Sequence, residues 1–87
     1  MSEVTIDIKN KSYGITYKRT EEENGSTNIY VSIDNVELQK IVGLEFNIVL
    51  RIKENIIGFK NATEEQRATR EFDSIVKAIL KAENINF

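Results

Sequence analysis

The sequence predicts an α+β fold, in which an antiparallel sheet of five to six strands, open or partly curled into a barrel, carries one C-terminal amphipathic helix. From residue 3 to about residue 60, apolar residues recur at every second position, which is typical of strands with one buried and one solvated face. From residue 61 onward the apolar spacing becomes helical. The chain has 87 residues and no interior linker, repeat or low-complexity segment, so we expect a single domain over residues 1–87.

The first three strands are the clearest. Val4–Ile8 and Tyr13–Tyr17 alternate apolar and polar residues around a polar turn at 10–12, which predicts a hairpin. A polar connection over 19–27 contains Asn24-Gly25, a pair suited to a tight reversal. The third strand, Ile29–Ile33, follows with the same alternation.

The next stretch is less regular. Asp34-Asn35 suits a two-residue hairpin turn leading into a strand at Val36–Leu38. The alternation slips at 39–43, which suggests a bulge or bend. Leu44–Lys53 is then the strongest strand, with five successive inward positions beginning at Leu44 and ending at Ile52. A tight turn at 54–55 precedes a last short strand, Ile56–Lys60.

A helix is predicted from about Ala62 to Glu83. Thr63 and Gln66 have the spacing of a capping box, in which each side chain bonds the backbone amide of the other residue. Phe72, Ile75 and Ile79 then form an apolar stripe that we expect to pack on the sheet. Phe87, at the end of the chain, either docks on the domain or a neighbour or is disordered.

The composition excludes several kinds of chemistry. The sequence has no His, Cys, Pro or Trp. It therefore has no disulfide, no Cys/His zinc or haem site and no Ser-His or Cys-His nucleophile. Catalysis would rest on carboxylate, Lys or Tyr groups alone, and no two carboxylates are placed together by the pattern. We expect a non-enzymatic protein with no cofactor and no metal.

Charge and hydropathy give no sign of a membrane or a phosphate backbone as the partner. Twelve basic against 14 acidic residues leave a net charge of −2, whereas nucleic-acid binders are usually basic. The first residues lack the features of a signal peptide, and no apolar run is long enough to span a membrane. We expect a cytoplasmic protein.

Two polar clusters are candidate sites. Glu21, Glu22 and Glu23 form an acidic loop suited to a cation or a basic partner, although they lack Asp-x-Asp-x-Asp spacing, and a solvated loop explains them as well. Aromatic and basic residues lie close together in the second predicted strand, as in sheets that stack nucleic-acid bases, but the two tyrosines share the phase of core residues. This second set is Tyr13, Tyr17, Lys18 and Arg19.

A third candidate is the solvated sheet face, where the apolar pattern is broken. Tyr30 and Val49 project to the same side as Arg51 and other polar residues. Val42 and one of Ile56 and Ile57 must also lie away from the core unless the sheet curls. Exposed apolar residues on a sheet, or an uncapped edge strand, commonly mark a binding surface.

These observations favour a protein-interaction module whose partner is another protein, or a second copy bound through the sheet face or edge. The size and the Ile/Lys/Asn/Glu-rich, Cys-free composition are typical of phage and mobile-element proteins, which suggests an inhibitor of a host defence protein. The alternatives are a small nucleic-acid-binding domain using the Tyr/Lys/Arg surface and an assembly component of a larger particle.

Overall fold

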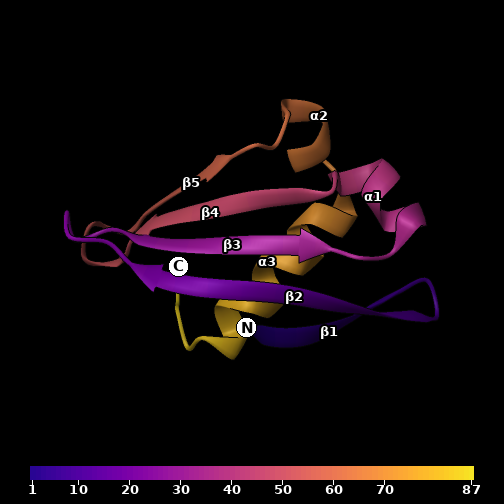
Figure 1. Cartoon of the computed structure of the whole chain (residues 1–87), viewed down its shortest axis with the longest axis horizontal. Coiled ribbons are helices and arrows are strands. Elements are labelled where there is room, and N and C mark those ends of the chain that lie inside the picture. The colour runs from indigo at the N-terminus through magenta and orange to yellow at the C-terminus, as the bar shows by residue number, and fades with distance from the viewer.

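The alternating residues form a five-stranded antiparallel sheet in a computed structural model of the chain, which describes residues 1–87 (Figure 1). The strands lie side by side in chain order and the sheet is open, because β1 and β5 are its two edges. The predicted α+β class is therefore confirmed, in its open form. The elements are β1 (Ser2–Ile8), β2 (Lys11–Glu21), β3 (Thr27–Ile33), α1 (Val36–Val42), β4 (Glu45–Arg51), the 3₁₀ helix η1 (Ile52–Glu54), β5 (Ile56–Lys60), α2 (Glu64–Arg67) and α3 (Arg70–Ala82).

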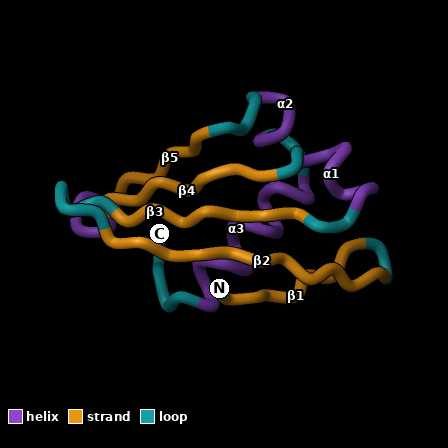
Figure 2. The backbone as a smooth tube through the Cα atoms, in the orientation of Figure 1, coloured by secondary structure: helices purple, strands orange, loops and turns teal.

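The turns between strands use left-handed Asn and Gly residues. Lys9 and Asn10, with φ of 50° and 68°, form the two-residue turn between β1 and β2. Gly25 has a φ of 85° in the β2–β3 turn, as its pairing with Asn24 predicted. Figure 2 shows that the β1–β2 turn lies at the α1 end of the sheet, whereas the β2–β3 turn and η1 lie at the opposite end.

The predicted strand at Val36–Leu38 is wrong, because this segment begins the helix α1. Asn35 is its N-cap: the side-chain oxygen accepts a hydrogen bond from the Leu38 amide at 2.9 Å. Leu38 and Val42, four residues apart, are both buried, so Val42 lies in the core and not away from it as predicted. Gly43, with a φ of 89°, ends the helix.

The ends of the strongest strand also differ from the prediction. Leu44 is 66% exposed, because the chain turns at Gly43 directly before it. Ile52 is 42% exposed, because η1 begins there. The strand is therefore Glu45–Arg51, with Phe46, Ile48 and Leu50 fully buried.

The predicted single C-terminal helix consists of two pieces. Thr63 and Gln66 form the predicted capping box at the start of α2. The chain then leaves the helix at Ala68, and Thr69 caps α3 by accepting a hydrogen bond from the Phe72 amide at 3.1 Å. A second cap of this kind starts a new helix axis, because a residue at the N-cap has extended backbone dihedrals.

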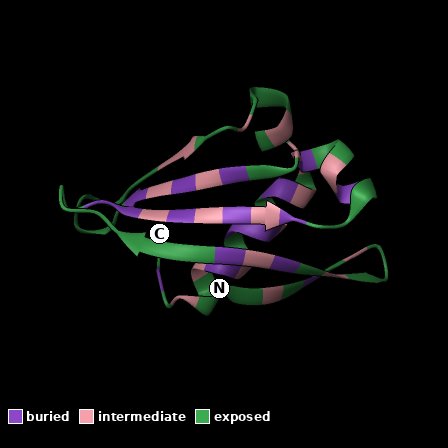
Figure 3. Ribbon diagram, viewed as in Figure 1, coloured by how far each residue is buried: buried purple, intermediate pink, exposed green.

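The core lies between the sheet and α3, which crosses behind the strands in Figure 1. Phe72, Ile75 and Ile79 of α3 are buried against the sheet, as predicted. Phe72 contacts Phe46 and Phe59, with ring centroids 4.5 and 5.1 Å away. No helix or loop element covers the opposite face of the sheet (Figure 3), and no helix is long and apolar enough to cross a membrane.

Candidate protein-interaction surface

The largest hollow of the molecule is a groove between the edge strand β5 and α3, with a volume of about 550 Å³. Its walls come from three segments, which are β5, the outer side of α3 and the last residues of the chain. The apolar side chains that line it are Ile57, Phe59, Val76, Leu80, Ile85 and Phe87. We call this hollow the β5–α3 groove.

The groove exists because α3 lies obliquely under the sheet. The helix packs along β1, at the far edge, and near its first turn Phe72 lies against Phe59 of β5. No residue of β5 is buried (Figure 3). Ile56 is 52% exposed on the uncovered sheet face, and Ile57 is 37% exposed on the groove side, so one of the two isoleucines lies away from the core as predicted.

The end of the chain forms the third wall. Asn84, with a φ of 57°, ends α3 in a Schellman motif, in which the Ile85 amide bonds the Leu80 carbonyl at 2.8 Å and the Asn84 amide bonds the Lys81 carbonyl at 3.1 Å. This turn buries Ile85 and leaves Phe87 about half exposed beside the groove. Phe87 thus borders the groove without being buried in the domain.

The charged rim of the groove is mainly neutralised within α3. Lys77 pairs with Asp73 at 2.9 Å, one helical turn earlier. Lys81 makes no ion pair. The groove therefore has an apolar floor and one cationic side chain without an ion-pair partner, that of Lys81. Beside it, β5 is an edge strand, so the backbone amide and carbonyl groups on its free side are not paired with another strand.

A polar network joins the other end of α3 to β2. The Tyr17 hydroxyl donates to Glu83 Oε2 at 2.7 Å, and Arg19 Nη1 lies 3.3 Å from Glu83 Oε1. Arg19 Nε also donates to Glu21 at 2.5 Å, and Thr27 donates to the same carboxylate at 2.6 Å. This network ties the C-terminal end of α3 to β2.

The network shifts three pKa values. Burial, and then the neighbouring Glu83 carboxylate, raises the pKa of the Tyr17 hydroxyl. The hydrogen bond from Thr27, and then that from Arg19, lowers the pKa of Glu21. The hydrogen bond to Glu21 is the main cause that raises the pKa of Arg19. All three shifts are caused by burial and by hydrogen bonds within the network itself, as is typical of an ion-pair network that stabilises a helix end.

The three consecutive glutamates of the predicted acidic loop, Glu21 to Glu23, do not act as one cluster in the structure. Glu21 belongs to the network, whereas Glu22 and Glu23 are exposed in the β2–β3 turn. Gly25 donates its amide to the Glu22 carbonyl at 3.1 Å, which holds the turn. The chain has no group of three or more acidic side chains placed to hold a metal ion.

The structure also separates the four residues predicted to bind nucleic acid. Tyr13 and Tyr17 lie on the helix side of β2, where Tyr17 is buried. Arg19 lies on the same side, in the polar network. Lys18 projects from the uncovered face, opposite Tyr30 of β3. The two tyrosines and Lys18 therefore do not share one surface.

Tyr30, Val49 and Arg51, the predicted partner-binding residues, all lie on the uncovered sheet face. The Tyr30 hydroxyl donates to Glu45, and this bond raises the Tyr30 pKa. Val49 and Arg51 line a shallow, mostly polar hollow of about 380 Å³ with Lys60 and the β2–β3 turn. Tyr30 and Val49 are half-buried by their neighbours, so this face is less apolar than the pattern suggested.

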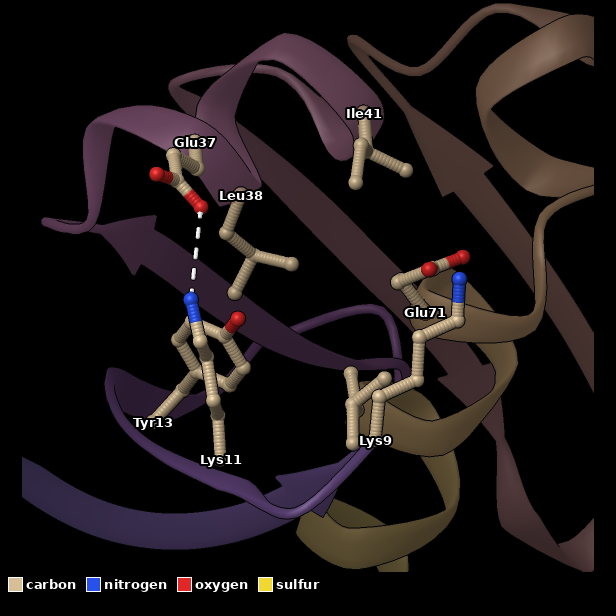
Figure 4. A pocket seen from close by; sticks show the side chains of 8 residues that line it. Lys9, Lys11, Tyr13, Glu37, Leu38, Ile41 and Glu71 are labelled. Atoms are coloured by element: carbon tan, nitrogen blue, oxygen red, sulfur yellow. Dashed lines mark ion pairs between the residues drawn. The ribbon is translucent and has the colours of Figure 1, made fainter.

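A smaller hollow of about 230 Å³ lies between the β1–β2 turn and α1 (Figure 4). Lys11 Nζ lies 3.9 Å from Glu37 across one side, and Lys9 points toward Glu71 across the other. Its floor is formed by the apolar residues Ile8, Leu38 and Ile41. The Lys11–Glu37 pair is exposed, so it contributes little to stability, and nothing else in this hollow indicates a ligand.

The β5–α3 groove was not among the predicted sites. Its sequence signal was the pair Ile56 and Ile57, because consecutive isoleucines place an apolar side chain on each face of a short last strand. The contributions of Leu80 and Phe87 had no signal, since they depend on the angle at which α3 crosses the sheet. No protein-family model, curated protein or solved structure matches the chain.

Proposed function

We propose that the protein is a non-enzymatic protein-interaction module that binds its partner along β5 and in the β5–α3 groove. The observation that carries this proposal is the pairing of an unprotected edge strand with an apolar groove beside it. An edge strand offers a row of backbone donors and acceptors that a second strand can use. The neighbouring groove can take the side chains of that strand, which is how strand-addition domains obtain specificity.

The edge has few of the usual devices that protect an edge strand against such pairing. β5 contains no Pro, no bulge and no charge pointing to the helix side, and its only charged residue is Lys60 at its end. Ile57 and Phe87 are exposed apolar side chains on the groove side of this edge, and Ile56 is exposed on its other face. Exposed apolar side chains are common at protein-binding surfaces. That the partner is a host defence protein, as the composition suggested, stays a prediction.

The proposal is tested with the change Ile57→Lys, which places a charge in the groove. Ile57 is partly exposed, so the fold should tolerate the longer side chain. Leu44→Lys is the matched control, because Leu44 is an exposed apolar residue at the α1 end. The immobilised chain is incubated with a bacterial lysate and, separately, with untagged copies of itself.

We expect the original chain and Leu44→Lys to retain the same protein, whether a lysate component or the untagged chain, and Ile57→Lys to lose it. Retention that is equal for Ile57→Lys and the original chain would contradict the proposal. So would the absence of any retained protein in both incubations.

A further inference from the structure

We propose that the occupant of this surface is a second copy of the chain, with β5 paired antiparallel to β5 of the second copy around a two-fold axis at Gly58. This inference rests on the proposed function, because it names the partner of the same surface. The two sheets would then form one continuous sheet, with both α3 helices on the same side. The two β5–α3 grooves would face each other across the axis.

The ends of β5 fit this register. Asn55 and Asn61 have left-handed backbones, with φ of 56° and 63°, and each ends the strand on its side. Both lie three residues from Gly58. A two-fold axis at Gly58 therefore pairs all five residues of β5 with those of the second copy, and the chain turns away at the same distance on each side.

The side chains that would face each other are compatible. Ile57 would lie opposite Phe59 of the second copy on the groove side. The two-fold symmetry would form the same pair a second time, between Phe59 and Ile57 of the second copy. Aromatic with β-branched pairs of this kind stabilise antiparallel sheets by about 0.2–1 kcal/mol each. On the other face, Ile56 lies opposite Lys60 of the second copy, whose aliphatic stem can cover it. No like charges are opposed.

The other edge of the sheet is unsuited to the same pairing. A two-fold axis at the centre of β1, at Thr5, would place Glu3 opposite Asp7 of the second copy, and directly opposed like charges destabilise a sheet. The helix side of β1 is also occupied by α3. The charge pattern thus protects β1, whereas β5 is left open.

A cysteine at the axis tests the register directly. The chain has no Cys, so Gly58→Cys introduces its only thiol. A Cβ at Gly58 meets no atom within 4 Å, so the fold accommodates it. Directly opposed residues of antiparallel strands have Cα atoms about 4.5–5.5 Å apart, within the range that a disulfide spans. Gly14→Cys is the control, because Gly14 lies on the same sheet face but in β2, away from both edges.

With oxidised glutathione, we expect Gly58→Cys to form a disulfide-linked dimer about tenfold faster than Gly14→Cys or more, because pairing raises the effective thiol concentration. In sedimentation from micromolar to millimolar concentration, the unmodified chain should approach twice its mass of 10.0 kDa, and Ile57→Lys should not.

Equal cross-linking rates for the two variants would overturn the second-copy proposal, as would a monomer mass at every concentration. The proposed function would survive those results if the chain still retained a lysate protein that Ile57→Lys lost. If the chain retained no protein from the lysate either, both the proposed function and the second-copy proposal would be contradicted.

Discussion

Tyr17 occupies the position that its phase in the sequence favoured, in the core and not on a nucleic-acid-binding surface. Its ring is buried among core residues, and its hydroxyl reaches Glu83 at the end of α3. The sequence indicated this position through the phase that Tyr17 shares with Ile15. It did not indicate Glu83, which is 66 residues away and becomes a neighbour only through the crossing angle of α3.

Removing the Tyr17 hydroxyl tests its part in anchoring α3. Tyr17→Phe should lower the free energy of unfolding at pH 7 by about 1 kcal/mol, because a part-buried hydrogen bond to a carboxylate is lost. Urea unfolding at one protein concentration measures this loss. Tyr30→Phe is the control, because its bond to Glu45 is exposed and the loss should be smaller. Equal losses would contradict the anchoring role.

The raised pKa of Tyr17 also predicts that the stability difference between the original chain and Tyr17→Phe depends on pH. The folded-state pKa of Tyr17 is raised above its ordinary value of 10.0, so folding favours the neutral hydroxyl. The resulting stability is fully present below pH 10 and is lost as the pH rises through the folded-state pKa. The stability difference between the original chain and Tyr17→Phe should therefore shrink above pH 10. A constant difference would contradict this assignment.

At the scale of elements, strands were more predictable than helices. The period-two pattern defines β1, β2 and β3 because their register and burial follow from local alternation. Asn35 misled the prediction, because a short polar residue before an apolar run suits a hairpin turn and a helix N-cap equally. The spacing of Leu38 and Val42 was the available sign of α1. The break between α2 and α3 was hidden because apolar spacing continues across it.

The cap at Thr69 should therefore matter more than the cap at Thr63. Thr69→Ala removes the side-chain acceptor at the start of α3, whose buried stripe forms the helical half of the core. We expect a loss of about 1 kcal/mol in the free energy of unfolding. Thr63→Ala should cost less, because α2 has four residues and none is buried. Thermal and urea unfolding compare the two, and an equal or larger cost for Thr63→Ala would contradict this account of the break.

For the whole molecule, the main consequence of the fold is its asymmetry. The helix α3 packs on β1, meets β2 through the Tyr17–Glu83 bond at one end and contacts Phe59 through Phe72 at the other, while no residue of β5 is buried. The sequence predicted that an edge or a face of the sheet would be a binding surface. It could not predict which edge, because that choice depends on contacts between distant residues.

Amide hydrogen exchange of the two edge strands tests the central claim, that β5 is the strand by which two copies of the protein associate. The original chain is compared at micromolar and at millimolar concentration, and β1 serves as the internal control. At a total chain concentration ten times the dissociation constant of the dimer, about a fifth of the chains are still monomeric, so we expect the free-edge amides of β5 to exchange about fivefold more slowly than in the dilute chain, while β1 is unchanged. Exchange of β5 that does not depend on concentration, or equal slowing of β1, would contradict it.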